Sequence, residues 1–207
     1  MEKKTTDLHL PMISVPGGKA GLGPFREELN EKYWEWQQNP KVMTGYGMPM
    51  APYREDQKKM FEQQARRSSE IIRFTVYDLT GDAPVAAGQV GLRVLTRDNC
   101  AEFFMYIGEP GSRGKGVGTE AARLTLDYAF HIARIKCVYL TAFEPNAGAI
   151  RAYEKAGFKR QGVRRDSGSW LGRTVNEIHM DAIPEEFVGV SAIKQDVESD
   201  PPVRMVS

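Results

Sequence analysis

Hydrophobic and polar positions along the 207-residue chain follow the two periods that are typical of strands and helices. Residues 71–79 (IIRFTVYDL) alternate and end at Thr80-Gly81-Asp82, which predicts a strand. Similar patterns predict strands at 9–15, 83–95, 99–108, 136–143, 158–165 and 174–183. Helical spacing predicts helices at 26–38, 54–67, 116–133 and 146–157. Pro16-Gly17-Gly18 and Asn39-Pro40 are interpreted as stops after the first strand and the first helix.

The order of these elements predicts an α/β fold with one mixed sheet. It runs strand, two helices, three strands, helix, strand, helix and two strands, which favours a largely antiparallel sheet of about seven strands with helices on both faces. The strand at 136–143 is continuously apolar, as in strands that are covered on both sides. We expect a single domain over residues 1–187 and a mobile C-terminal tail over 188–207.

The composition argues against several classes of protein. Hydrophobic residues make up 41% of the chain and charged residues 27%, and the formal net charge is +1. This balance gives no electrostatic reason to expect nucleic acid or an anionic membrane as a partner. Cys100 and Cys137 stand alone, so they predict neither a disulfide framework nor a metal site. With no signal peptide or membrane-length apolar run, we expect a cytoplasmic protein.

Residues 109–118 (EPGSRGKGVG) place glycines and basic residues between a predicted strand and a predicted helix. Glycine lets the backbone approach a ligand, and the first amides of a helix lack intrahelical partners, so this turn favours an anion. A mononucleotide P-loop requires Ser or Thr after its lysine, but Gly116 follows Lys115. The dinucleotide pattern GxGxxA occurs at 116–121, yet the linker from the strand is long and too little chain follows for a doubly wound domain.

The turn and a second segment together resemble the GCN5-related N-acetyltransferases, the GNAT superfamily. Arg113-x-x-Gly116-x-Gly118 has the form of the family's pyrophosphate loop, Q/R-x-x-G-x-G/A. NAGAIRAYEKAGFKRQG (146–162) resembles the family's helix with its asparagine, its tyrosine and its closing Gly-Phe. Residues 22–42 resemble the N-terminal helix of the branch that includes ribosomal-protein-alanine and spermidine acetyltransferases. The resemblance covers most of residues 20–185.

The resemblance implies a GNAT fold that binds acetyl-CoA where the parallel strands 99–108 and 136–143, the fourth and fifth predicted strands, splay apart. The exposed backbone of one strand would pair with the pantetheine arm as an added strand does. The resemblance implies no metal. The implied cofactor-binding residues are Met105, Tyr106, Ile107, Arg113, Gly114, Lys115, Gly116, Val117, Gly118, Thr119, Asn146 and Tyr153.

The implied reaction moves an acetyl group to a primary amine by direct attack in a ternary complex. Tyr153 matches the family's helix tyrosine, which can protonate the leaving thiolate; the alternative is a packed aromatic residue. Glu102, eleven residues before Arg113, resembles the catalytic glutamate of the histone-acetylating branch. An apolar setting would raise its pKa toward that of a useful base. The alternative is a solvated residue, and many family members use water or no dedicated base.

The acceptor is the component that the sequence specifies least. The resemblance implies a small-molecule amine or a protein N-terminus, and Trp34, Tyr46 and Met48 belong to a segment that corresponds to the family's acceptor-covering region. Glu177 lies on one face of the last predicted strand, where it could line the acceptor cleft. Packing of the helix pair on the sheet and a solvated strand face are the alternative roles for these residues. A non-catalytic CoA-binding module and an acyltransferase for another acyl-CoA are the alternative functions. Homodimers through the last strands are common in such folds, so a homodimer stays open.

Overall fold

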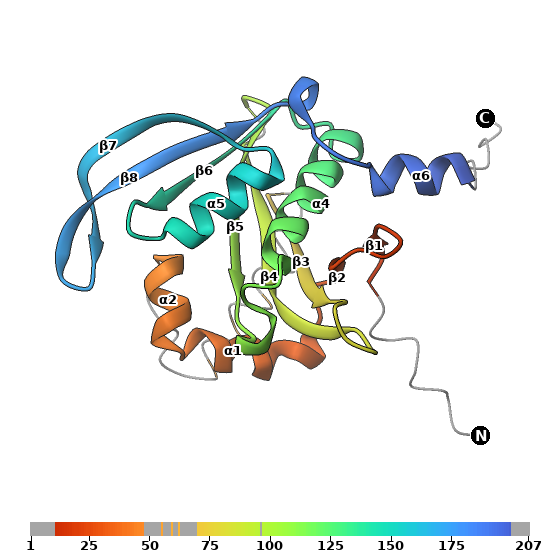
Figure 1. The fold of residues 1–207 in the computed structure, drawn as a ribbon, viewed down its shortest axis with the longest axis horizontal. Helices are drawn as coiled ribbons and strands as arrows, with labels where there is room; N and C mark the ends of the chain where they lie inside the picture. Colours follow the sequence, from red (N-terminus) through yellow and green to blue (C-terminus); the bar gives the residue numbers. More distant parts are fainter. Residues whose placement is uncertain are drawn as a thin grey trace.

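The computed structural model describes residues 11–47, 55, 59, 62, 70–95 and 97–199. They form a sheet of eight strands in the order β1-β2-β3-β4-β5-β6-β8-β7 (Figure 1). Neighbouring strands are antiparallel except β5 and β6, which are parallel. The strands are β1 (Ile13–Ser14), β2 (Ala20–Pro24), β3 (Ile71–Asp78), β4 (Val85–Leu95), β5 (Cys100–Ile107), β6 (Cys137–Phe143), β7 (Lys159–Trp170) and β8 (Arg173–Ala182).

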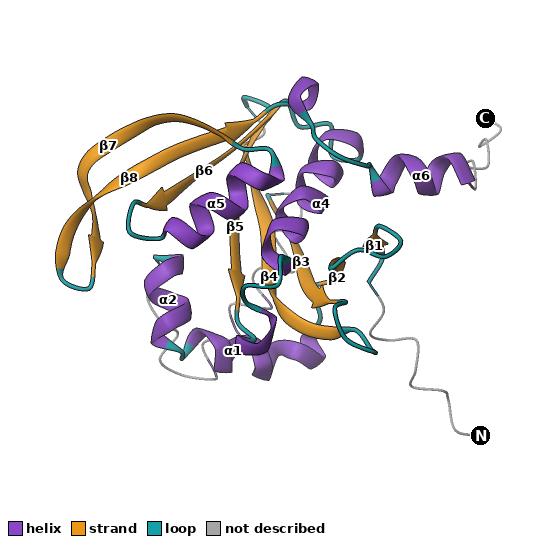
Figure 2. Cartoon of the chain, viewed as in Figure 1, coloured by secondary structure: helices purple, strands orange, loops and turns teal. Residues whose placement is uncertain are grey.

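Helices cover both faces of this sheet (Figure 2). Side chains alternate across β5, so Phe103 joins the main core with α4 and α5, whereas Tyr106 packs in a second cluster with residues of α1 and α2. The α/β class with helices on both faces is thereby confirmed. The helices are α1 (Asn30–Gln37), α2 (Pro40–Tyr46), α4 (Val117–His131), α5 (Ala147–Ala156) and α6 (Ala192–Ser199).

The helix α4 anchors the main core because it presents apolar residues on several sides. Val117, Ala121 and Leu124 are completely buried there. α4 contacts β2, β3, β4 and β5 on one side and α5 on another. Since α4 begins directly after the glycine-rich turn, its packing fixes where the free amides at its N-terminus point.

The sheet has one more strand than the sequence pattern predicts. β2 was missed because its sequence, AGLGP, lacks the alternation and β-branched residues that mark strands. Its backbone nevertheless pairs with β3, where Leu22 lies opposite Val76. Gly21 is required at this point, because a Cβ there would lie 2.4 Å from the Cβ of Pro11. Pro16-Gly17-Gly18 is therefore the turn of a hairpin rather than the end of the first sheet segment.

The helix α2 was also missed, because Asn39-Pro40 was interpreted only as a stop. The Asn39 side chain accepts a hydrogen bond of 3.0 Å from the backbone amide of Lys41, so it caps a new helix. Pro40 occupies the first turn, where its missing N–H has no consequence. Gly47 ends α2 in a left-handed conformation. The helix predicted at 54–67 lies mostly outside the described residues.

The described part of the predicted tail contains a helix that the sequence pattern did not predict, α6, at residues 192–199. Ser191 Oγ donates a 2.6 Å hydrogen bond to Asp127 Oδ1, and the amide of Ile193 donates to Asp127 Oδ2 at 3.2 Å. Asp127 is completely buried in α4, so its carboxylate needs these donors.

β7 also runs beyond the predicted end at residue 165, as far as Trp170. Among the described residues, no helix has the length and apolar character needed to cross a bilayer.

Candidate active site

The strands β5 and β6 pair only over their first residues. The register joins Cys100, Ala101 and Glu102 to Cys137, Val138 and Tyr139. β5 then continues to Ile107 and β6 to Phe143 without further pairing between them. The backbone edge of β5 beyond Glu102 is therefore open toward β6. This divergence confirms the predicted splay between the two parallel strands.

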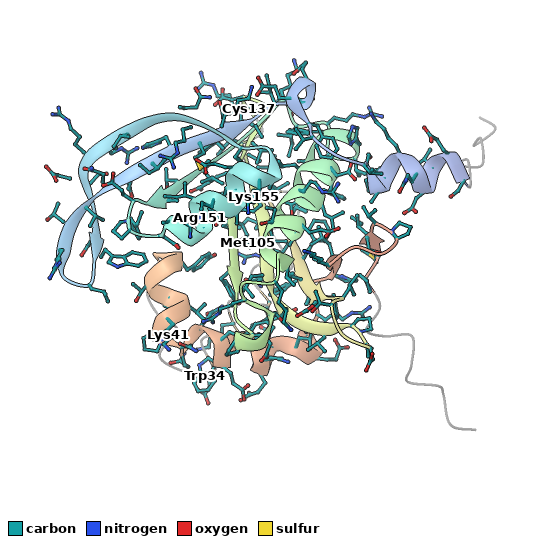
Figure 3. All side chains as sticks on the ribbon, in the orientation of Figure 1. Trp34, Lys41, Met105, Cys137, Arg151 and Lys155 are labelled. Atoms are coloured by element: carbon teal, nitrogen blue, oxygen red, sulfur yellow. The ribbon has the colours of Figure 1, made fainter. Side chains whose placement is uncertain are left out.

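A cavity of about 570 Å³ lies at this opening. That volume lies within the range of small-molecule and cofactor sites. In Figure 3, Met105 lies beside α5, which carries Arg151 and Lys155, while Lys41 lies lower on α2. The wall includes ten of the predicted cofactor residues, namely Met105, Tyr106, Ile107, Arg113, Gly114, Gly116, Gly118, Thr119, Asn146 and Tyr153.

The glycine-rich turn exposes the backbone at the start of α4. Gly114 and Gly116 have φ angles of 76° and 93°, values that favour glycine. Gly116 is the N-cap residue of α4, and no side chain caps the helix there. The first amides of α4 thus remain available to an anion at the positive end of the helix dipole. A Cβ on Gly118 would lie at an ordinary 3.5 Å from the side chains of Ile107 and Met105, so alanine fits at this position.

The side chain of Arg113 supports the turn rather than reaching into the cavity as a free charge. Its Nε donates to the carbonyl of Ile107 at 3.0 Å, and its Nη2 donates to the carbonyl of Gly108 at 2.9 Å. The side chain of Arg113 thereby ties the turn back to the end of β5.

Two residues predicted to bind the cofactor, Lys115 and Val117, are not on the cavity wall. Val117 is completely buried in the core. Burial alone would raise the pKa of Asp78, but hydrogen bonds from Ser112 and Thr80 and the charge of Lys115 lower it. Lys115 therefore acts electrostatically on a carboxylate of β3. Its side chain is exposed.

Asn146 connects the start of α5 to α2. Its Oδ1 accepts from the amide of Ala149 at 3.4 Å, which caps α5, and its Nδ2 donates to the carbonyl of Gly45 at 3.3 Å. The partners of this interhelix bond lie 101 positions apart in the chain, so the sequence alone could not reveal it. Asn146 thereby fixes the distance between the two helices that flank the opening.

Tyr153 is the tyrosine on the cavity wall that α5 supplies. Its ring lies 5.6 Å from that of Phe103 and 6.0 Å from that of Phe158, so packing holds its orientation. Burial and the neighbouring Tyr46 raise the pKa of Tyr153 to about 12. The phenol consequently keeps its proton at neutral pH and can donate it.

The predicted base, Glu102, lies on the opposite side of the sheet from α5, and it is not on the cavity wall. It forms an ion pair with Arg93 on the neighbouring strand β4. Tyr46, a predicted acceptor residue, lies on this same side, with its ring 5.3 Å from that of Tyr106. Burial raises the pKa of Tyr46, and Arg73, Arg93 and Glu102 also influence it electrostatically.

The other predicted acceptor residues are dispersed. Trp34 lies on α1 (Figure 3) and is not on the cavity wall. Trp36 is the tryptophan that is buried beside Tyr106. Met48 lies outside the described residues. Glu177 lines a second hollow of about 560 Å³ between α2 and the β7–β8 hairpin. Its Oε2 accepts from Arg164 at 3.2 Å and from Ser167 at 3.0 Å.

Sequence reasoning missed three cations on the cavity wall: Lys41 on α2, and Arg151 and Lys155 on α5. None of them forms an ion pair with another residue in the part of the chain that the structure describes. Arg151 and Lys155 stand four residues apart and therefore share a face of α5. The spacing of Arg151 and Lys155 on the helix that follows Asn146 is the sequence signal that could have identified them as residues of the site. The described residues contain no group of acidic, histidine or cysteine side chains suited to a metal ion.

Comparison with known families agrees with this geometry. Residues 20–159 match the family model described as "Acetyltransferase (GNAT) domain". The chain belongs to the GNAT acetyltransferase family. The probable N-acetyltransferase YjcK of Bacillus subtilis is 33% identical over 110 residues, which are 52% of this chain and 60% of that protein. The spermidine N(1)-acetyltransferase of Escherichia coli K12 is 36% identical over 102 residues, or 49% of this chain and 55% of that protein.

These two matches therefore span little more than half the length of each curated relative. A solved structure is similar over a longer range. The spermidine N-acetyltransferase of Vibrio cholerae, in complex with CoA and spermine, matches with a TM-score of 0.75 and 20% identity. The match covers 83% of this GNAT chain and 99% of that chain, and at this identity it supports the fold alone.

Proposed function

We propose that this GNAT protein is an acetyl-CoA-dependent N-acetyltransferase that acts on a primary amine. One observation carries the proposal: the open edge of β5 lies beside the uncapped N-terminus of α4, and a single cavity includes both. An unpaired strand edge suits an extended amide-containing chain, and a free helix N-terminus suits phosphate. The acetyltransferase relatives support the same reaction.

The cavity fits acetyl-CoA, which supplies an activated acetyl group. The first amides of α4, held by Gly114 and Gly116, would bind the pyrophosphate. The edge of β5 from Met105 to Ile107 would pair with the pantetheine arm. Arg151 and Lys155 give the α5 side a positive charge that suits the remaining phosphate of this ligand.

Acetyl transfer requires three events that the residues around the cavity can perform. The neutral amine forms an N–C bond with the acetyl carbon while the C–S bond breaks. A backbone amide of β5 donates a hydrogen bond to the carbonyl oxygen as that oxygen gains charge. Tyr153 gives its hydroxyl proton to the departing sulfur and is reprotonated from solvent.

The attacking amine must also lose a proton, and Glu102 is the proposed acceptor of that proton. Its carboxylate lies on the side of the sheet that Tyr46 occupies, and it acts electrostatically on Tyr46. We propose a small-molecule amine as the acceptor, with a protein N-terminus as the other candidate. The spermidine acetyltransferase relatives support a small amine. A homodimer and a cytoplasmic location stay predictions.

Isothermal titration of acetyl-CoA tests the proposal directly. Wild-type protein should bind it, and Gly116→Val should weaken binding about tenfold or more because a β-branched residue is strained at a positive φ. Gly111→Ala is the matched control, since Gly111 lies in the same turn with open space around its Cβ position and no positive φ. Free-thiol release should then report transfer to amines. Absence of binding by the wild type would overturn the proposed function.

A further inference from the structure

Three strands and α2 bring a set of charged and aromatic side chains together on the α2 side of the sheet, at the beginning of the splay. The register places Glu102 opposite Arg93 on one side and opposite Tyr139 on the other. Two residues further along β5, Phe104 lies opposite Gly91 of β4, and Gly91 in turn lies opposite Arg73 of β3. We call Tyr46, Arg73, Arg93, Glu102 and Phe104 the Arg73 cluster.

Gly91 allows two members of this cluster to meet across β4. A Cβ on Gly91 would lie 2.4 Å from Cζ of Phe104, so the phenyl ring extends over the glycine. The Arg73 guanidinium lies 4.9 Å from the centre of that ring and 5.9 Å from the ring of Phe25. These cation–π contacts hold the guanidinium in place without neutralising it.

Arg73 is a half-buried cation that lacks a carboxylate partner among the described residues. Its Nη1 donates to Gln89 Oε1 at 3.5 Å, and its Nε is buried without a hydrogen bond. Burial lowers the pKa of Arg73, and the charge of Arg93 lowers it further. Tyr46 and Tyr106 oppose this change. A buried charge with incomplete partners is unfavourable, so an anion placed here would be stabilised.

The carboxylate of Glu102 does not supply that anion, because it pairs with Arg93. The ionised side chains of the Arg73 cluster are thus two guanidinium groups and one carboxylate, with an excess of positive charge. A polyamine would meet like charge there, whereas an amine that also bears an anion would meet a partner. Arginine is suited to this task because its planar fork matches carboxylate and phosphate oxygens.

The Arg73 cluster is also continuous with the point of acetyl transfer. Gly45, which precedes Tyr46 on α2, lies on the cavity wall. Tyr106 packs against Tyr46 and lines the cavity. An amine held beside Tyr46 and Tyr106 would therefore lie next to both the cavity and the Arg73 cluster.

We propose that the acceptor carries an anionic group besides its amine, and that Arg73 pairs with this group. The inference rests on the proposed acetyltransferase function and specifies its substrate class. It assigns this protein a preference opposite to that of a polyamine site. Carboxylate and phosphate share the required chemistry, and the experiment separates them.

The test compares matched amines that differ in one anionic group: phenylalanine with phenethylamine, lysine with cadaverine, and phosphoethanolamine with ethanolamine. Spermidine is the polycationic reference. Free-thiol release gives kcat/KM for each amine with wild type, Arg73→Gln, Arg73→Lys and the control Arg160→Gln. Arg160 pairs with Glu154 at the exposed surface and is not on the cavity wall.

For at least one pair we expect the wild type to prefer the anionic member by about tenfold or more, as a charge-assisted hydrogen bond provides. Arg73→Gln should remove that preference by raising KM for the anionic amine, and should leave kcat/KM for the counterpart without the anionic group within about twofold of the wild type. Arg73→Lys, which keeps the charge, should retain part of the preference and reports on folding if the Gln variant is unstable. Arg160→Gln should behave as the wild type.

A preference for spermidine or for the members that lack the anionic group would overturn this inference, as would an unchanged preference in Arg73→Gln. Acetyl-CoA binding without transfer to any anionic amine would also overturn it, while leaving the cofactor assignment intact. Loss of acetyl-CoA binding by the wild type would instead overturn the proposed function. Calorimetry of acetyl-CoA therefore distinguishes the two failures.

Discussion

The two sides of the sheet at the β5–β6 opening are built in different ways. On the α4–α5 side, a cradle of backbone amides and glycines faces the cavity, with Arg113 bonded to carbonyls and Tyr153 held by packing. On the α2 side, the surface consists of charged and aromatic side chains from β3, β4 and β5, among them Arg73 and Glu102. A backbone cradle suits a constant ligand, whereas side chains can differ from one enzyme to the next and select the acceptor.

The largest effect should come from the hydroxyl on the cofactor side. Tyr153→Phe should lower kcat about a hundredfold or more, because a positioned general acid contributes on this scale. The affinity for acetyl-CoA should change less than about threefold, since the ring contacts of Tyr153 with Phe103 and Phe158 remain. Steady-state thiol release and calorimetry measure the two quantities. Tyr128→Phe is the control, because Tyr128 lies on α4 against Phe74 and is not on the cavity wall.

The pH profile sharpens this prediction. Burial raises the pKa of Tyr153 to about 12, so the phenol stays protonated below that pH and loses its proton only above it. Wild-type kcat should therefore rise or stay level between about pH 7 and pH 10 as acceptor amines lose their protons. A wild-type decline near pH 10 that is absent from Tyr153→Phe would contradict the raised pKa.

A smaller effect is expected from the carboxylate on the α2 side. Glu102→Gln should lower kcat/KM about tenfold near pH 7, and the defect should shrink near pH 9, where more of the amine is neutral without a base. Glu186→Gln, which breaks the surface ion pair with Lys159, is the matched control. A defect that is constant across this pH range would assign Glu102 to holding Arg93 in place instead of proton transfer.

The two sides also differ in how far the sequence reveals them. The cofactor side depends on residues close together in the chain, so the glycine pattern and the Asn146-to-Gly157 segment predicted its elements and half of the residues on its cavity wall. The Arg73 cluster depends on register between β3, β4 and β5, which no local pattern specifies. Arg73 itself was never a candidate, since an arginine within an alternating strand resembles any solvated residue.

The errors in the fold have the same origin. β2 contains Gly and Pro and is held by pairing with β3, so local propensity misses it. α6 is fixed by its approach to the buried carboxylate of Asp127, more than 60 residues away along the chain. By contrast, α4 and β6 carry their burial in their own apolar pattern, and the sequence predicted both.

The smallest effect should come from Arg113, whose charge suggests a phosphate ligand but whose bonds indicate a support. Arg113→Gln should lower acetyl-CoA affinity only about threefold, and should lower the free energy of unfolding by about 1–2 kcal/mol through the lost bonds to Ile107 and Gly108. Arg113→Lys decides between the two roles, since lysine keeps the charge but lacks the planar fork that bonds both carbonyls. Urea denaturation should show that Arg113→Lys loses nearly as much stability as Arg113→Gln. Calorimetry measures the acetyl-CoA affinity of both variants. If Lys instead matched the wild type in both measurements, the charge of Arg113 would matter more than its bonds, and the cofactor side would depend on side chains as the α2 side does.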